Sequence, residues 1–354
     1  TNDIYVPDDC DFVIEGSVDP SAPLTVEGDF GDHTGFYSLT DLYPRLHVTA
    51  ITHRKDALYP ATVVGVPPQE DAYISIATER IFLAPIRLVM QPEIVDMTMP
   101  VAGTSHNIAI ISMSSRYKGQ AAKVTQGMWS AGQMMFNKYL VLTPATTDVR
   151  NAEQLAALLR GCDPKSATIR GEGIYDVLDH ATATCGFGGK LALNLTENST
   201  ARTPSVTEHI ALPEGVTMRT DLVDMWSTLL LFADNSADID LTTIARQAGV
   251  ECNFIALFDT RAAEFGAEDL LWIAAANTDP KRDIALTDST LTIDARAKVP
   301  GAENNPARFP NVVTSTEDVI ELVDSRWEEY GIGEFIPSPS RKYRKLLLSD
   351  KAEW

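Results

Sequence analysis

The feature that most constrains the fold is a regular alternation of strand-like and helix-like segments after residue 104. HNIAIISM reads as a buried strand, GQAAKVTQGMWSAGQMM as a helix, KYLVLT as a strand and AEQLAALLRG as a helix. The alternation returns later in STLLLFAD, LTTIARQAGV, CNFIALFD and AEDLLWIAAA. Such a pattern is typical of βα units, in which helices cover a mainly parallel sheet. We therefore predict an α/β domain over residues 96–336.

The N-terminal part of the chain has a different texture. DFVIEGSV and RLHVTAITH are rich in β-branched residues and are separated by clusters of Gly, Pro and Asp, which indicates β structure. After a Pro-Pro pair, apolar residues recur at helical spacing over residues 69–90, and Pro85 is expected to kink that helix. The predicted order is β structure (1–66), a linker helix (67–95), the α/β domain and a C-terminal arm (337–354).

Two stretches of the later part resemble each other. Residues 138–169 and 252–286 share a strand, a loop, a helix that starts A-E-x-L, and a D-P-K turn. Because D-P-K is a common turn, both a duplication and a coincidence remain open from the sequence, and so does the status of residues 197–281.

Charge and cysteine content limit the possible partners. The chain has 29 Lys and Arg against 49 Asp and Glu, a formal charge of −20, which argues against binding nucleic acid or an anionic membrane. The four cysteines are widely spaced, with no C-x-x-C pair, so we expect free thiols and a cytoplasmic location. The chain starts with Thr1, and its opening reads like the interior of a longer protein.

The densest chemical signal is VEGDFGDHTGFY, residues 26–37. Glu27 and Asp32 lie five residues apart, and glycines that fold the loop back would bring the two carboxylates together. Like charges in a partly apolar site raise one pKa, as general acid catalysis requires. The alternative is a polar turn in which Asp29 and Asp32 bond their own backbone. The D-x-D-x-D-G spacing of a calcium loop is absent.

Two further segments carry basic groups. His53, Arg54 and Lys55 follow a predicted strand, and a carboxylate or phosphate is one possible ligand for them, a solvated turn being the alternative. C-G-F-G-G-K, which ends at Lys190, is a glycine-rich turn without the spacing of a P-loop. Its backbone N–H groups and one ammonium would still suit a phosphate.

Taken together, these segments resemble the UbiD family of prenylated-flavin-dependent decarboxylases. The resemblance runs through VIEGSVDP, VEGDFGDHTGFYS, VTAITHRKDALYPATVVGVPPQED, YKGQAAKV, DVLDHATATCGFGGK and IDARAKVPGAENN. It covers roughly residues 11–196 and 282–335, and it suggests that the chain is the C-terminal portion of such a protein.

The resemblance implies reversible, non-oxidative loss of CO₂ from an aromatic or α,β-unsaturated acid, such as a polyprenyl-hydroxybenzoate or a naphthoate in ubiquinone or menaquinone biosynthesis. The cleaved bond leaves an electron pair that no side chain can accept, and in the family prenylated FMN accepts it. The implied fold is α/β plus β: part of a split, flavin-reductase-like β-barrel, joined by the long helix to the α/β domain. A divalent metal (Mn or Mg) and K⁺ are expected at the cofactor phosphate, with ligands upstream of this chain.

Family roles are carried over only to matching positions. Asp32 corresponds to the acid that protonates the carbon after CO₂ leaves. Glu27 corresponds to the carboxylate that pairs with an upstream Arg and tunes that acid, and Lys190 matches a Lys near the cofactor phosphate. The remaining cofactor-binding candidates are His33, Arg54 and Lys55.

The expected partners follow from the same resemblance. Members of the family form dimers or hexamers, so we expect a homo-oligomer that binds a small aromatic acid, with at most peripheral membrane contact if the substrate is prenylated. Two other classes stay open. One is a non-catalytic oligomerisation or binding fragment, and the other is a carboxylate-based metal hydrolase that uses Glu27, Asp29, Asp32 and His33.

Overall fold

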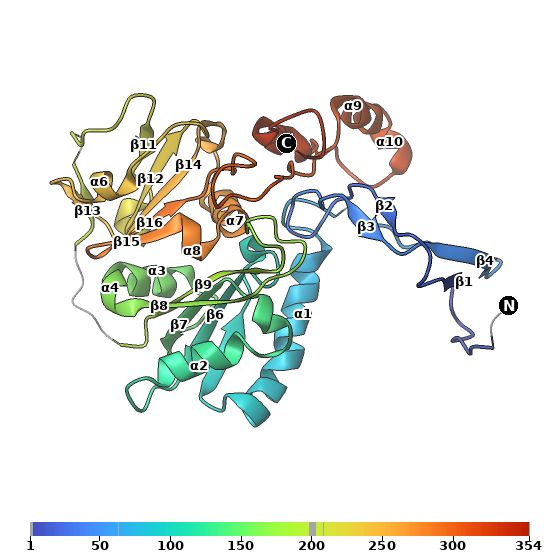
Figure 1. The fold of residues 1–354 in the computed structure, drawn as a ribbon, viewed down its shortest axis with the longest axis horizontal. Helices are drawn as coiled ribbons and strands as arrows, with labels where there is room; N and C mark the ends of the chain where they lie inside the picture. The colour runs from blue at the N-terminus through green and yellow to red at the C-terminus, as the bar shows by residue number, and fades with distance from the viewer. Residues whose placement is uncertain (1–2, 63, 198–202, 208, 354) are drawn as a thin grey trace.

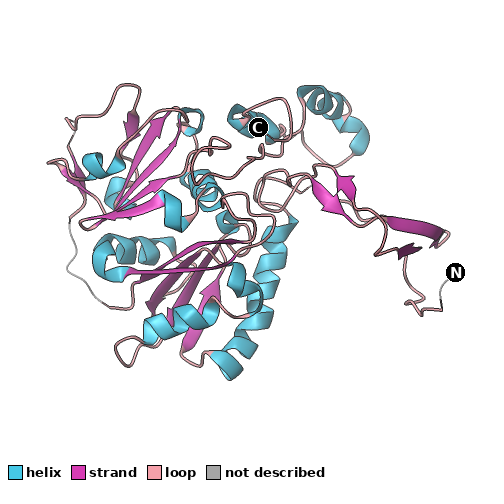
Figure 2. Ribbon diagram, in the orientation of Figure 1, coloured by secondary structure: helices cyan, strands magenta, loops and turns pink. Residues whose placement is uncertain are grey.

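A computed structural model describes residues 3–62, 64–197, 203–207 and 209–353 (Figure 1). Thr1, on which the expectation of a longer protein partly rests, lies outside them. Two α/β units lie side by side, and an N-terminal β ribbon projects from them (Figures 1 and 2). Within the described residues, no helix is both long enough and apolar enough to span a bilayer.

The first unit is built on a five-stranded mixed sheet with the order β5-β6-β7-β9-β8. Its inner strands run parallel, and both edge strands are antiparallel to their neighbours. The strands are β5 (Ile94–Thr98), β6 (Ile108–Met113), β7 (Tyr139–Pro144), β8 (Thr168–Ile174) and β9 (Phe187–Asn194), and the helices are α2 (Gln120–Met128), α3 (Ala152–Gly161) and α4 (Pro164–Ala167).

The second unit has the strand order β11-β12-β14-β16-β15, again with antiparallel edges around a parallel centre. Its strands are β11 (Thr217–Arg219), β12 (Thr228–Ala233), β14 (Phe254–Asp259), β15 (Ile284–Thr287) and β16 (Thr290–Asp294), beside a small pair, β10 (Ser205–Val206) and β13 (Val250–Glu251). Its helices are α5 (Val223–Trp226), α6 (Leu241–Ala245), α7 (Ala267–Asn277) and α8 (Pro280–Asp283).

The two units repeat one topology, which favours duplication over coincidence. In both, a central strand leads through two helices to an antiparallel edge strand, which then pairs with the next inner strand. Both D-P-K segments start the short second helix, where Asp163 and Asp279 accept the backbone N–H of Lys165 and Lys281. The single, mainly parallel sheet that we expected is therefore two mixed sheets. The periodicity detected the βα units but not the edge hairpins.

The structure contains the helix that the sequence predicted over residues 69–90. Helix α1 (Glu70–Pro85) continues as a π-helical turn (Ile86–Met90), so the helical hydrogen-bond pattern changes at Pro85, where the sequence predicted a kink. Glu79, only 2% exposed, accepts the backbone N–H of Met99 at 2.8 Å and bonds Arg150. These contacts fasten α1 to the first sheet.

The N-terminal strands form two antiparallel pairs. β1 (Phe12–Val18) pairs with β4 (Leu46–His53), and β2 (Thr25–Glu27) pairs with β3 (Asp41–Tyr43). The expectation of β structure here is confirmed, but the described residues of this chain do not close a barrel. The barrel therefore stays a prediction.

The C-terminal arm packs on the second unit. Tyr343 donates to Asp269 at 2.8 Å, and the Asn311 amide donates to the Ser349 carbonyl at 3.0 Å. Helix α11 (Ser340–Tyr343) lies in the arm, and α9 (Glu317–Ser325) and α10 (Trp327–Tyr330) precede it.

The loop of residues 31–38 joins the N-terminal ribbon to the second unit. Its turn is closed by the Gly35 N–H, which donates to the Asp32 carbonyl at 3.0 Å, and Gly35 has a φ of +87°. The Trp272 indole N–H donates to the Thr34 carbonyl at 2.7 Å. Phe36 enters the core, with its ring centroid 5.4 Å from that of Trp272. These contacts hold the loop against α7.

This anchoring predicts an asymmetry between two glycines of the same motif. A Cβ on Gly35 would lie 2.7 Å from Trp272 and would require a left-handed backbone, whereas a Cβ on Gly28 would meet nothing within 4 Å. Gly35→Ala should therefore lower the free energy of unfolding by about 2–4 kcal/mol. Gly28→Ala, the matched control, should change it by less than about 0.5 kcal/mol in urea titrations. Equal effects would show that the loop is not packed on Trp272.

Candidate functional site

The candidate site is centred on Asp32 and His33, at the turn of the anchored loop. Asp32 Oδ1 lies 3.1 Å from His33 Nδ1, and Asp32 Oδ2 accepts the backbone N–H of Thr34 at 3.2 Å. The Asp32 side chain is 5% exposed and the His33 side chain 18%. The polar-turn alternative is therefore correct for Asp32, which bonds its own backbone, but the carboxylate also holds an imidazole.

Two residues from the first unit complete the surroundings of His33. The His106 ring lies 5.4 Å from the His33 ring, and its Nε2 is 3.9 Å from an oxygen of Asp176. One ligand atom from each of His33, His106 and Asp176 lies within 4.8 Å of the others. These three groups have the composition of a site for a divalent transition metal.

Charges around the turn distinguish the two imidazoles. Burial works to lower the pKa of His33, but the hydrogen bond and charge of Asp32, with the charges of Asp176 and Asp71, outweigh it and raise that pKa. Burial works to raise the pKa of Asp32, but His33 and Thr34 outweigh it and lower that pKa. Burial and the charge of His33 lower the pKa of His106 to about 4. Within the pair the proton is therefore favoured on His33 over Asp32, and the lowered pKa of His106 favours its neutral form.

A second polar group lies behind the loop and was missed by our sequence reasoning. Lys138, fully buried, bonds Asp179 at 2.7 Å. The neighbouring His180 contacts Asn277 Oδ1 at 3.2 Å, and its ring lies 4.4 Å from Phe36. The sequence pattern D-x-x-D-H, residues 176–180, contains Asp179 and His180 of this group as well as Asp176. It could have indicated them, but we assigned a site residue in that segment only at Lys190.

Lys190 has a different environment from the predicted one. Its ammonium donates to the carbonyls of Met135, Asn137 and Ile174 at 2.7, 2.6 and 3.1 Å, and the residue is 2% exposed. Burial, followed by the charge of Lys138, lowers its pKa to about 8. Because all three donors are occupied, Lys190 in this structure has none left for a phosphate.

The glycines before Lys190 serve packing. A Cβ on Gly188 would lie 2.5 Å from the Thr182 side chain, and a Cβ on Gly189 would lie 2.4 Å from the backbone nitrogen of Lys281. The Gly189 N–H also donates to Asp279 Oδ1 at 2.8 Å. The glycine-rich turn thus lets the two α/β units approach each other. A turn that serves close packing in this way has a sequence similar to that of a phosphate-binding loop.

The other candidates lie on the projecting ribbon. Glu27 is exposed, and its backbone pairs with Asp41, so the structure does not show the predicted convergence with Asp32. Arg54 lies 3.9 Å from Asp11, and Lys55 is exposed, which fits the solvated-turn alternative for this segment. The catalytic role of Glu27 and the cofactor roles of Arg54 and Lys55 stay predictions.

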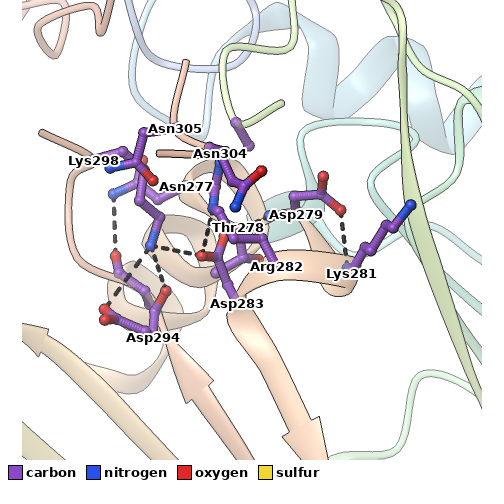
Figure 3. A network of polar contacts seen from close by, with 12 residues as sticks. Asn277, Thr278, Asp279, Lys281, Arg282, Asp283, Asp294, Lys298, Asn304 and Asn305 are labelled. Carbon is purple, nitrogen blue, oxygen red and sulfur yellow. Dashed lines mark hydrogen bonds and ion pairs between the residues drawn. The ribbon is translucent and has the colours of Figure 1, made fainter. Parts of the chain in front are cut away.

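The charged segment near residue 300 forms an internal network (Figure 3). Lys298 lies 3.2 Å from Asp283 and donates to the Asp294 carbonyl at 2.7 Å. Arg282 pairs with Asp283 at 2.6 Å and donates to the Asn304 carbonyl at 3.1 Å. These charges satisfy one another, so the IDARAKVPGAENN motif has a structural role in this unit.

The cofactor fit can be tested on these residues. A flavin phosphate needs free donors, but Lys190 is saturated by carbonyls, and Arg54 and Lys55 stand on the ribbon. A small, open hollow beside His33 is lined partly by Gln69, Asp71 and Ser105, which offer no cation. The predicted cofactor-binding residues Lys190, Arg54 and Lys55 therefore do not form a flavin cradle by themselves.

Comparison with known proteins places this architecture in a family. A model of the 3-octaprenyl-4-hydroxybenzoate carboxy-lyase Rift-related domain matches residues 1–67, and a model of the C-terminal domain of that carboxy-lyase matches residues 72–195. Together the two matches span more than half of the chain. The chain belongs to the UbiD family, which confirms the resemblance.

Two relatives and one solved structure are similar to this chain. An uncharacterized protein of Aquifex aeolicus is 44% identical over 214 residues, 59% of this chain and 44% of that protein. One of Helicobacter pylori is 32% identical over 339 residues, 91% of this chain and 54% of that protein. The open form of Sedimentibacter hydroxybenzoicus vanillic acid decarboxylase matches with a TM-score of 0.51 and 26% identity, over 60% of this chain and 47% of that chain. The chain thus spans about half the length of the curated relatives it matches.

The buried imidazoles predict a specific response to acid. Burial lowers the pKa of His180 to about 4, from 6.5 in the unfolded chain, so its contribution to stability is complete above pH 6.5 and is lost as the pH falls towards 4. Its share is on the order of 3 kcal/mol. His180→Gln, which cannot titrate, should reduce the loss of unfolding free energy between pH 6.5 and 4.

The matched control is His47→Gln, because His47 is exposed on β4. In urea titrations across this pH range, the unfolding free energy of His47→Gln should depend on pH as steeply as that of the wild type. If the unfolding free energy of His180→Gln also depended on pH as steeply as that of the wild type, the assignment of a buried, neutral His180 would be contradicted.

Proposed function

We propose that this chain is the C-terminal portion of a UbiD-type carboxy-lyase, which removes CO₂ without oxidation from an aromatic or α,β-unsaturated acid. The observation that supports it most is the placement of Asp32. The carboxylate is buried and held by His33, on a loop that is fixed to the α/β body. A group that delivers a proton to one carbon needs such positioning.

The reaction defines what Asp32 contributes. When CO₂ leaves, the electrons of the broken bond remain with the substrate, and a proton must be added to that carbon to form the product C–H bond. Asp32 is the acid that supplies this proton. Prenylated FMN is the proposed electron sink, and longer relatives contain additional sequence from which its cradle would come. Mn or Mg, K⁺ and a homo-oligomer stay predictions of the family resemblance.

The substrate is proposed only as a class. The similar Sedimentibacter enzyme is named for vanillic acid, an aromatic acid, which supports an aromatic carboxylate here. A polyprenyl-hydroxybenzoate or a naphthoate of quinone biosynthesis is the more specific proposal.

The alternatives fit the geometry less well. The metal hydrolase required Glu27 and Asp29 beside His33, but both carboxylates are exposed, and Asp29 accepts from Thr40 at 2.6 Å. A purely structural role as a non-catalytic fragment does not account for a buried carboxylate–imidazole pair. It stays the alternative to catalysis for this chain when it is isolated from the full-length protein.

The test is a pair of substitutions in the full-length protein, supplied with prenylated FMN. Asp32→Asn should lower the decarboxylation rate at least about 100-fold, because the amide cannot deliver a proton. Asp29→Asn, an exposed change in the same motif, should keep the wild-type rate. CO₂ release on a panel of aromatic acids measures both, with circular dichroism to check folding. A folded Asp32→Asn enzyme with the wild-type rate would contradict the proposed function.

A further inference from the structure

His33, His106 and Asp176 come from three separate segments and converge on one point. His33 lies on the anchored loop, His106 precedes β6, and Asp176 follows β8. We propose that these three side chains bind a zinc ion, which fastens the loop that carries Asp32 to the first α/β unit. The inference goes beyond the proposed function and assigns His33 to a metal rather than to the flavin. It uses none of the upstream residues that the resemblance assigns to the metal at the cofactor phosphate.

The His33 ring is supported in the way that metal-binding imidazoles are. Asp32 Oδ1 lies 3.1 Å from His33 Nδ1, and the Asp32 side chain is 5% exposed. When Nδ1–H donates to this carboxylate, Nε2 carries the lone pair that a metal ion needs. A carboxylate behind a ligating imidazole fixes both the orientation of the ring and its tautomer.

The other two ligands are held by bonds that leave one atom free for an ion. Asp176 Oδ1 accepts the Leu178 N–H at 2.9 Å, and Asp176 Oδ2 lies 3.9 Å from His106 Nε2. The backbone carbonyl of His106 accepts the side-chain amide of the buried Asn137 at 2.9 Å. Each ligand therefore has its position set before an ion arrives, which lowers the cost of binding.

The spacing of the ligand atoms suits zinc after a small movement. One ligand atom from each of the three residues lies within 4.8 Å of the others. Tetrahedral zinc, with bonds of about 2.0–2.1 Å, places neighbouring ligand atoms about 3.4 Å apart, so the side chains need to approach by roughly one ångström. Two imidazoles and one carboxylate favour zinc over Mg²⁺ or Ca²⁺, which prefer oxygen ligands. Water would fill the fourth position.

The charges around the two imidazoles are a second, independent argument. Asp32 bonds His33, Asp176 faces His106, and Asp71 lines the hollow beside His33. In the part of the chain that the structure describes, none of these three carboxylates pairs with Lys or Arg.

A neighbouring carboxylate shows the contrast. Asp179, three residues after Asp176, is paired with the buried Lys138 at 2.7 Å. Carboxylates that are shielded from solvent are normally paired with a cationic side chain or coordinate a metal ion. The group around His33 lacks the first, and a divalent ion would supply the missing positive charge.

The test is metal binding by the full-length protein without flavin, after EDTA treatment and removal of the EDTA. Co²⁺ is the probe, because its visible absorption reports a four-coordinate site, and Zn²⁺ should displace it whereas Mg²⁺ should not. X-ray absorption of the zinc-bound wild type should show imidazole among the ligands. Absence of stoichiometric Co²⁺ and Zn²⁺ binding, or a zinc site without imidazole, would overturn the proposal.

Substitutions locate the ion. His106→Gln and Asp176→Asn should each weaken Zn²⁺ binding at least about 100-fold, and Asp32→Asn, which removes the support of His33, about 10–100-fold. His47→Gln, an exposed change on β4, is the matched control and should keep the wild-type affinity. Circular dichroism checks folding. Binding that survives both ligand substitutions in folded protein belongs to another site, and the proposal is then wrong.

The fastening role has its own readout. Zn²⁺ should slow amide exchange at the Gly35 N–H, which closes the turn after His33, in the wild type but not in His106→Gln. Exchange that Zn²⁺ leaves unchanged in the wild type would contradict this role. None of these measurements uses substrate, so their outcome is independent of the decarboxylation assay on Asp32→Asn that decides the proposed function.

Discussion

The contact on which the rest of the site depends is the one between the residue 31–38 loop and α7. The Trp272 indole donates to the Thr34 carbonyl at 2.7 Å, and Phe36 packs beside the indole in the core. This contact links residues that are 238 positions apart in sequence. Because a buried polar contact and a buried ring act together, the turn that carries Asp32 and His33 has one defined position relative to both α/β units.

The repeated architecture of the two units explains why the site lies where it does. The first unit contributes His106 and Asp176, from segments that flank its sheet, and the second contributes the Trp272 anchor. The units meet through Asp279 and the Gly189 backbone, so the glycine-rich turn sets their separation. The site thus depends on two packed units and a loop from the N-terminal ribbon, and no one of these could form it alone.

Local patterns predicted much of this fold. The βα alternation, the linker helix with its change at Pro85, and the shared D-P-K turns follow from periodicity and turn chemistry, which act over a few residues. The edge hairpins and the meeting of His33 with His106 depend on contacts between distant segments, which no local pattern encodes. Lys190 shows the limit most clearly: glycines that allow close packing look the same in sequence as glycines that surround a phosphate.

The most direct test of this account is amide hydrogen exchange at the Gly35 N–H, which donates to the Asp32 carbonyl. In the wild-type chain it should be protected comparably to the strands of the second sheet, because opening the turn requires the loop to leave Trp272. Trp272→Phe, which removes the indole N–H, should speed exchange at this turn while β6 and β7 keep their protection. Fast exchange at Gly35 in the wild type, or protection that Trp272→Phe leaves unchanged, would contradict an anchored Asp32–His33 pair.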